Sequence, residues 1–276
     1  MPSGKRSKQQ RRETGSAPPP VRSKGAGARP RQASPRVLAI GGGVVALIVI
    51  GVVLALVLGR GGSSSGIPAG TPTIGAVDAN ALPGAAEIQS LYKGIPQVGL
   101  SLGSDTAPVQ MEMFIDLQCP ICQHFEVTAL PTIVRKYVRT GKVRLDVKPW
   151  AFIGKDSYRA RLVMIAASLQ NKAFQFAGVL YDNQGTENTG WATDSMLAQI
   201  ASSVQGLNVV KAFDARNTAK VKAIAKQVDQ LATSEGVQGT PTVLVGKNGG
   251  TLKDVATPGN APTLQQVTTA LDAALG

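Results

Sequence analysis

The two cysteines of this chain lie close together, in the sequence Cys119-Pro120-Ile121-Cys122. An apolar run precedes them and a helical pattern follows, so we expect Cys119 at a helix N-terminus, where free amides and the helix dipole stabilise a thiolate. Cys122 falls one turn further along the same face, close enough for a disulfide. Pro120 suits the first helical position, which needs no N–H. The spacing predicts a redox pair in which the exposed Cys119 attacks and Cys122 resolves the mixed disulfide.

Three other interpretations of the pair stay open. A structural disulfide gains stability by closing a long loop, whereas this one would close a loop of two residues. Half of a zinc site would need two further ligands, and the single histidine, His124, is the one candidate nearby. The pair could also be non-reactive. We expect no metal site and no cofactor apart from the disulfide itself.

The pair is positioned by elements that the hydrophobic pattern indicates. Residues 109–115 read as a strand, residues 119–140 as a helix that Pro131 divides, and residues 143–147 as a half-buried strand with alternating apolar and charged residues. No strand signal follows until about residue 240. Helices are expected in that block at residues 158–170, 174–181, 194–204 and 218–234.

The last segment completes an α/β pattern. Two short strands around a turn, residues 242–245 and 252–255, precede a final helix over residues 263–275. Thr263 is its expected N-cap, and Gln266 stands at capping-box spacing. The order of strands and helices predicts an α/β fold with a helical insertion.

The charge of the chain lies almost entirely at one end. The 276 residues carry a formal charge of +12, but residues 1–36 hold ten basic residues and the single acid Glu13. This region has almost no large apolar residues, so we expect a disordered basic tail. It also lacks the interleaved aromatics of a nucleic-acid binder, and we expect no nucleic-acid partner.

Residues 37–59 predict a transmembrane helix. These 23 residues contain no charge, and as a helix they span roughly 35 Å, enough for a bilayer core of about 30 Å. The basic flank places the N-terminus in the cytoplasm, beside anionic membrane lipids. A flexible Gly/Ser/Pro-rich linker, residues 60–83, would then connect a single-pass anchor to an extracytoplasmic domain of residues 84–276.

Three segments resemble the DsbA-like branch of the thioredoxin superfamily. Residues 107–126 (APVQMEMFIDLQCPICQHFE) are similar to its active-site segment, in which a strand ending in Asp leads into Cys-Pro-x-Cys. Residues 236–246 (GVQGTPTVLVG) resemble the loop that carries its cis-proline, and residues 94–109 resemble its first strand and the link to the second. The resemblance implies a thioredoxin-like fold over about residues 90–276.

The resemblance also assigns roles. Cys119 would be the attacking thiol and Cys122 the resolving thiol. Pro241 would be the cis-proline that faces them and leaves backbone groups free for an extended substrate peptide. Thr240, just before it, would touch the sulfurs and tune their potential.

Other positions near the cysteines either fit the family pattern or depart from it. Asp116 matches the acid at the strand end, although it could simply be an acid at a helix start. Pro120 and Ile121 are further candidates for tuning, and Ile121 replaces a histidine common in strongly oxidising relatives. Met113 stands where relatives often carry a buried acid that serves the resolving thiol, and Glu112 points to the opposite strand face. Water or Asp116 would have to move that proton.

These expectations lead to a membrane-anchored, extracytoplasmic thiol–disulfide oxidoreductase that donates a disulfide to exported, cysteine-containing proteins. The resemblance implies reoxidation by a membrane thiol oxidase linked to quinone. A reductase or isomerase would use the same residues but would pass electrons differently. The reduction potential of the cysteine pair distinguishes these functions from disulfide donation. A non-redox binding or chaperone module is the alternative from another class.

Overall fold

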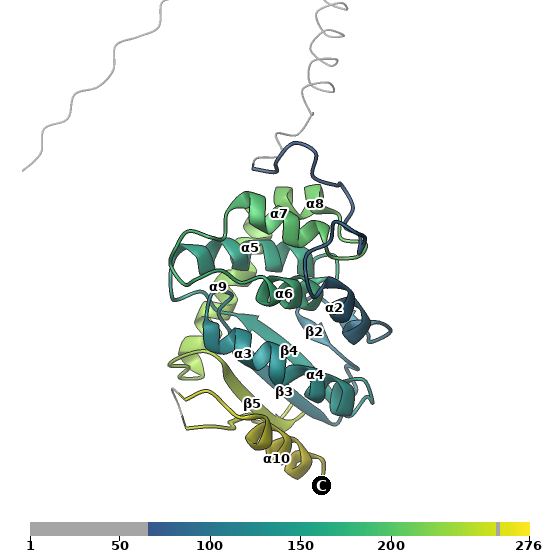
Figure 1. Cartoon of the computed structure of the whole chain (residues 1–276). Coiled ribbons are helices and arrows are strands. Elements are labelled where there is room, and N and C mark those ends of the chain that lie inside the picture. The colour runs from purple at the N-terminus through teal and green to yellow at the C-terminus, as the bar shows by residue number, and fades with distance from the viewer. Residues whose placement is uncertain (1–65, 258–259) are drawn as a thin grey trace, which may run out of the picture. The chain divides into compact units, whose positions relative to one another are not determined.

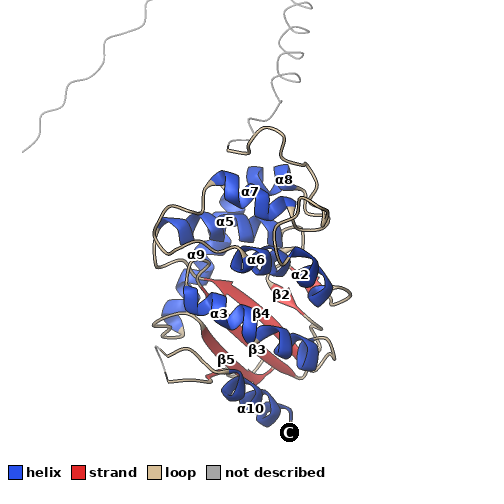
Figure 2. Cartoon of the chain, viewed as in Figure 1, coloured by secondary structure: helices blue, strands red, loops and turns tan. Residues whose placement is uncertain are grey.

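A mixed sheet lies at the centre of the structure, a computed structural model that describes residues 66–257 and 260–276 (Figures 1 and 2). Its strand order is β1-β2-β4-β3-β5-β6. β3 pairs in parallel with β4 and antiparallel with β5, so it occupies the middle of the sheet. The strands are β1 (Gln97–Val98), β2 (Ser101–Leu102), β3 (Val109–Ile115), β4 (Val143–Pro149), β5 (Thr242–Lys247) and β6 (Lys253–Asp254).

The two faces of β3 carry different side chains. Met111 and Met113 pack into the main hydrophobic core, whereas Phe114 packs with Ala232 and Leu244 on the other face. Successive side chains of a strand alternate between faces, so Glu112 lies on the Phe114 side. The expectation that Glu112 and Met113 face opposite sides is confirmed.

The expectation of a half-buried β4 is wrong at Asp146, which is only 2% exposed. Protein groups, rather than water, stabilise its carboxylate. It accepts a hydrogen bond from Gln110 Nε2 at 2.6 Å, pairs with Arg144 Nη2 at 3.0 Å and also bonds to the hydroxyl of Ser101. A buried charge is tolerated when such partners surround it.

Helices flank the sheet on both faces. Those near the cysteines, α3 and α4, share one face with α10, and the end of α9 packs on the other through Ala232 (Figure 2). The helices are α2 (Ala85–Tyr92), α3 (Pro120–Thr128), α4 (Leu130–Ile133), the π-helical turn η1 (Val134–Val138), α5 (Lys155–Ser168), α6 (Ala173–Asp182), α7 (Asp194–Ser202), α8 (Val209–Ala215), α9 (Ala219–Ser234) and α10 (Leu264–Leu275).

The helix after the cysteines is divided as its sequence predicts. α3 ends at Thr128, and α4 begins at Leu130 with Pro131 in its first turn, where a proline needs no N–H donor. The expected cap of the last helix is also confirmed. Thr263 and Gln266 form a reciprocal capping box at the start of α10.

The helical insertion contains the four predicted helices and one more. α8 was not expected, because its seven residues are too short to show a clear helical period; Asn208 caps it by accepting a hydrogen bond from Lys211 N at 2.8 Å. α2 was likewise not predicted. It packs on α6 and closes the core on the side of the insertion.

Part of the expected linker is attached to the insertion. Gly75 N donates to Leu207 O at 2.8 Å and Ala76 N donates to Ser202 O at 2.9 Å, so hydrogen-bonded structure begins before residue 84. The predicted tail and the predicted transmembrane helix lie outside the described residues. Within residues 66–257 and 260–276, no helix has both the length and the apolar character needed to cross a membrane.

Candidate active site

The two cysteines occupy the first turn of α3, directly after the carboxyl end of β3. Cys119 is the N-cap residue, with extended backbone, and its sulfur accepts a hydrogen bond from Cys122 N at 3.4 Å. Pro120 is in the first turn. Neither cysteine forms a disulfide in this structure. One expectation is corrected: Cys119 is only 5% exposed rather than an open thiol, because the loop around Thr240 packs against it.

The two thiols have opposite electrostatic environments. The pKa of Cys119 is lowered from 9.0 to about 6, mainly by a hydrogen bond from the side chain of Cys122. Hydrogen bonds from backbone amides and from the Thr240 side chain lower it further, whereas burial acts in the opposite direction. Burial raises the pKa of Cys122 well above its ordinary value, and the neighbouring Cys119 raises it further. At neutral pH the pair therefore holds one thiolate, at Cys119, and one thiol, at Cys122.

The loop before β5 faces the first thiol. The Thr240–Pro241 peptide is cis, which is the geometry that the resemblance implies for Pro241. Cys119 Sγ lies 3.4 Å from the carbonyl oxygen of Thr240. The hydroxyl of Thr240 is buried and finds no hydrogen-bond partner, although its proximity lowers the pKa of both thiols. A buried donor without a partner is available to a thiolate or to a bound peptide.

Asp116 organises the chain around the cysteines. It is 1% exposed, and its carboxylate accepts backbone N–H bonds from Gln118 at 3.0 Å, Phe152 at 3.1 Å and Ile153 at 3.2 Å. Its carbonyl oxygen accepts from Cys119 N at 3.0 Å. Asp116 thus joins the end of β3 to the loop after β4, and it does more than start a helix.

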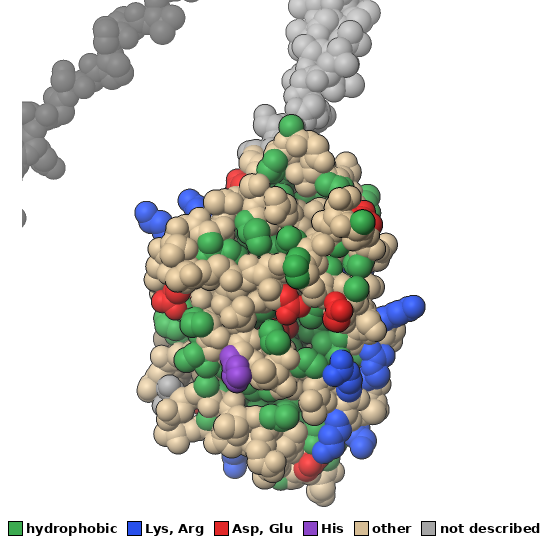
Figure 3. All heavy atoms as spheres, viewed as in Figure 1, with side chains coloured by type: hydrophobic (Ala, Val, Ile, Leu, Met, Phe, Trp, Pro, Cys, Tyr) green, Lys and Arg blue, Asp and Glu red, His purple; other side chains and the backbone are tan. Residues whose placement is uncertain are grey.

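The surface beside the cysteines is apolar. Ile121 is 52% exposed and Phe152 is 47% exposed, and the ring of Phe152 stacks on Trp150 with centroids 4.4 Å apart. A hollow of about 430 Å³ next to Ile121 is lined by residues that include His124 and Leu264. Figure 3 shows hydrophobic side chains spread over this face of the molecule, with acidic ones also near its middle and most of the visible basic ones toward one edge.

One buried acid near the pair was not singled out from the sequence. Glu126 lies four residues after Cys122 on α3 and is 6% exposed. Its position in a helix was visible in the sequence, but its burial depends on α2 and α6, which come from distant parts of the chain. Among the described residues, no cluster of three or more His, Cys, Asp or Glu is placed to hold a metal ion.

A reactive thiol at a helix N-terminus, a buried partner thiol one turn later and a facing cis-proline, on a thioredoxin-like fold with a helical insertion, define a thiol–disulfide oxidoreductase. The chain belongs to the thioredoxin family, which it matches over residues 97–267.

Curated relatives and solved structures agree with this class. The chain is 34% identical over 152 residues to a probable disulfide bond formation protein D of Bacillus cereus, covering 54% of this chain and 70% of that protein. The chain is 27% identical over 149 residues to the disulfide bond formation protein D of Bacillus subtilis, covering 52% of this chain and 66% of that protein.

Two solved structures share the fold. A thioredoxin-like oxidoreductase from Silicibacter pomeroyi superposes with a TM-score of 0.52 at 26% identity, covering 67% of this chain and 96% of that one. Oxidised BdbD from Bacillus subtilis superposes with a TM-score of 0.56 at 21% identity, covering 66% and 97%. The chain is therefore a thioredoxin-family oxidoreductase similar to disulfide bond formation protein D, with Cys119 and Cys122 as its Cys-x-x-Cys pair.

Proposed function

We propose that this enzyme is a disulfide donor, in which Cys119 is the attacking thiol and Cys122 the resolving thiol. The observation that carries the proposal is the position of Cys119 at the N-cap of α3, where its sulfur accepts a hydrogen bond from Cys122 N at 3.4 Å. This environment lowers the pKa of Cys119 to about 6, whereas the pKa of the buried Cys122 is raised. A stabilised thiolate favours the reduced form of the enzyme, and a pair whose reduced form is favoured is an oxidant. The names of the Bacillus relatives point in the same direction.

The substrates we propose are exported proteins with free cysteines. An extended peptide would pair with backbone groups beside Pro241, place an apolar side chain on the surface formed by Ile121 and Phe152, and offer its thiolate to Cys119. The exposed apolar side chains of Ile121 and Phe152 suit unfolded chains, which expose apolar residues of their own. Pro120 lies between the thiols, and Thr240 provides an unpaired hydroxyl, so both are candidates for tuning the potential.

We further propose that the enzyme works outside the cytoplasm on a single-pass anchor. The uncharged residues 37–59 and the basic residues 1–36 support this orientation. Disulfides persist in oxidising compartments, which fits a donor placed there. Reoxidation would come from a membrane thiol oxidase linked to quinone, within reach of the tethered domain.

Substrate trapping tests the roles of the two thiols. In the Cys122→Ala chain, the Cys119 thiolate attacks a disulfide of an oxidised substrate protein and releases the other substrate sulfur as a thiolate. The partner thiol that would resolve this mixed disulfide is absent, so the mixed disulfide should accumulate and disappear on reduction. The Cys119→Ala chain is the matched control and should trap none. If the two variants give the same pattern, the proposed roles are wrong.

A further inference from the structure

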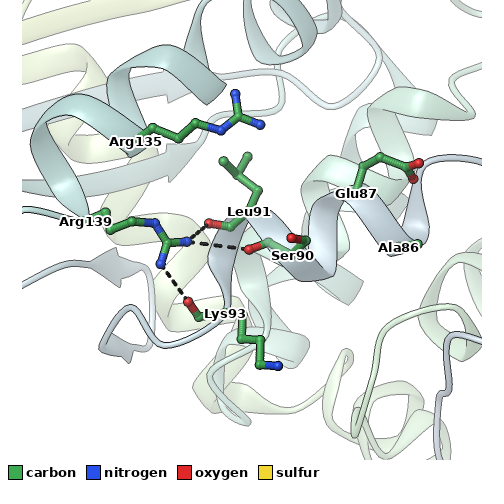
Figure 4. Close-up of a pocket in the computed structure, with 7 residues that line it drawn as sticks. All are labelled: Ala86, Glu87, Ser90, Leu91, Lys93, Arg135 and Arg139. Atoms are coloured by element: carbon green, nitrogen blue, oxygen red, sulfur yellow. Dashed lines mark hydrogen bonds between the residues drawn. The ribbon is translucent and has the colours of Figure 1, made fainter.

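A surface hollow that does not include the cysteines is lined mainly by basic side chains. It has a volume of about 710 Å³ and lies between α2 and η1 (Figure 4). Its charged lining residues are Lys93 at the end of α2, Arg135 of η1, Arg139 at the C-cap of η1 and one acid, Glu87. Three basic residues against one acid leave an excess of two positive charges. Residues 66–276 as a whole, with 18 basic and 16 acidic residues, have no larger excess.

Arg139 fixes the wall of this hollow without losing its charge. Its guanidinium donates hydrogen bonds to carbonyl oxygens at the end of α2, those of Leu91 at 2.6 Å, Lys93 at 3.0 Å and Ser90 at 3.5 Å. The last carbonyl groups of a helix lack partners within the helix, so a cation is favoured there. These acceptors are neutral, and no ion pair of the described residues includes Arg139. Its positive charge therefore remains available to an anion.

Arg135 and Lys93 have no bonded partner. Neither side chain makes a hydrogen bond or an ion pair within the part of the chain that the structure describes. Lys136, the neighbour of Arg135, by contrast has Asp272 at 3.5 Å. The hydroxyl of Ser90, which also lines the hollow, makes no hydrogen bond to a described residue either. A guanidinium, an ammonium and a hydroxyl are all donors, which suits the several acceptor oxygens of a phosphate group.

Glu87, the one acid in the lining, does not neutralise these groups. Figure 4 shows it at the opposite end of the hollow from Arg139. It also lines an adjacent hollow, together with Asp182 of α6. Burial raises the pKa of Asp182, and the charge of Glu87 raises it further, so Glu87 acts on that carboxylate. The basic end of the hollow is therefore open to an anion.

The backbone of η1 is unusual. It is π-helical, with a hydrogen bond from Arg139 N to Val134 O at 2.8 Å that spans five residues. Turns of this kind are rare, and they occur frequently at functional sites. This turn presents Arg135 and Arg139 to the same hollow. Because Arg139 holds α2 and Arg135 has no structural partner, the turn provides one guanidinium that packing does not use.

Apolar groups beside the cations favour a lipid headgroup over a soluble anion. Ala86 and Leu91 form the apolar part of the lining. Val98, five residues after Lys93, is 76% exposed, and Val127 in the adjacent hollow is 49% exposed. Surfaces that combine basic residues with exposed apolar side chains bind the interface of anionic bilayers.

We propose that the hollow between α2 and η1 binds the phosphate of an anionic phospholipid, and that the domain docks on the membrane surface by this face. The inference goes beyond the redox chemistry of the cysteines, but it rests on the proposed membrane location. Arg135 lies 16 residues after Cys119, across α3 and α4, a helical length of up to about 24 Å. Docking by this face therefore leaves the cysteine pair open to substrates.

Chemical modification of arginine tests the site in the full chain. The protein is placed in nanodiscs of phosphatidylcholine, with or without phosphatidylglycerol, and treated with phenylglyoxal, which reacts with free guanidinium groups. Mass analysis follows each arginine. Phosphatidylglycerol should slow the modification of Arg135 by at least about 5-fold, the change expected for one basic residue at an anionic surface. Arg159 on α5, which is also exposed and has no bonded partner among the described residues, is the control and should react equally in both nanodiscs.

Salt and free phosphate identify the ligand. Sodium chloride at about 1 M shortens the Debye length to about 3 Å and should remove the protection of Arg135. Inorganic phosphate, added to nanodiscs of phosphatidylcholine alone, should not protect Arg135. Equal rates at Arg135 in the two nanodiscs, or equal protection of Arg135 and Arg159, would overturn the proposal. Protection by inorganic phosphate alone would assign the hollow to a soluble anion and would overturn the lipid as its ligand.

Two charge-matched double variants give an independent readout. In the unaltered chain, phosphatidylglycerol should slow amide hydrogen exchange in α2, and in Lys93→Gln/Arg135→Gln this slowing should be lost. Lys155→Gln/Arg159→Gln removes the same charge from α5 and should keep the slowing. Loss of the slowing in both double variants would show a general effect of charge and would overturn the site.

Failure of the docking is distinguishable from failure of the other proposals. The Cys119 thiolate should react with oxidised glutathione at the same rate in all three chains, because neither double variant alters the surroundings of the cysteines. Release of the chain from nanodiscs of phosphatidylcholine would contradict the proposed anchor, whereas the difference between Arg135 and Arg159 in phosphatidylglycerol depends on the hollow.

Discussion

The sulfur of Cys119 lies 3.4 Å from the carbonyl oxygen of Thr240, although 121 residues separate them in the chain. This contact joins the N-terminus of α3 to the loop that contains the cis-proline. It places a thiolate, an unpaired hydroxyl and an exposed apolar surface within one small area. The reactivity of the pair depends on this junction as much as on the two cysteines.

Removing the Thr240 hydroxyl should weaken the thiolate. The side chain of Thr240 lowers the pKa of Cys119, so Thr240→Val should raise that pKa and make the enzyme less oxidising. The ultraviolet absorbance of the thiolate, followed against pH, measures the change. Thr242→Val is the control, because the hydroxyl of Thr242 already donates a hydrogen bond to Gly239 O at 2.9 Å. An equal rise in the pKa of Cys119 in both variants would contradict a specific role for Thr240.

The reduced enzyme should lose stability in acid. The pKa of Cys119 is lowered from 9.0 to about 6 on folding, so the charged thiolate contributes stability that is fully present above pH 9 and is lost as pH falls through 6. The oxidised enzyme lacks this group. The difference in free energy of unfolding between reduced and oxidised enzyme, from urea denaturation, should therefore move in favour of the oxidised form as pH decreases. A difference independent of pH would contradict the lowered pKa.

Asp116 should contribute to stability through the three N–H groups that it binds. Asp116→Asn replaces one accepting oxygen by a donor that faces backbone donors, so we expect a loss of about 2 kcal/mol in the free energy of unfolding in both redox forms. Asp254→Asn is the control, since Asp254 accepts a single exposed bond from Ala256 N, and its effect should stay within about 0.5 kcal/mol. Similar losses in both variants would show that Asp116 does not hold the loop.

The proposed topology predicts which side of the membrane each part occupies. In a chain whose native cysteines are replaced by alanine, Ser234→Cys should react with a membrane-impermeant thiol reagent in intact cells. Ser16→Cys, in the basic tail, should react only after the membrane is permeabilised. The reverse pattern, or labelling of both in intact cells, would contradict a single-pass anchor with a cytoplasmic tail.

Much of the site follows from local sequence. The apolar run of β3, the Cys-Pro-Ile-Cys spacing, the proline that divides the next helix and the Thr263 capping box are all short-range signals, and the structure has each of them. Their reliability comes from elementary constraints on helices and strands, which act within a few residues.

The remaining features depend on packing between distant segments. The burial of Cys119 comes from the Thr240 loop, and that of Asp146 comes from partners on neighbouring strands. Glu126 is buried because α2 and α6 close over α3. A charged residue in a helix usually reads as solvent-exposed, so no sequence pattern marked this acid as part of the site.

The reduction potential of the Cys119–Cys122 pair tests the central claim most directly. It is measured on the full chain by equilibration with glutathione buffers and quantification of the dithiol and disulfide forms. An oxidising donor with a stabilised Cys119 thiolate should have a potential close to about −120 mV. A value near about −270 mV, typical of a thiol reductant, would contradict the proposed direction of electron flow.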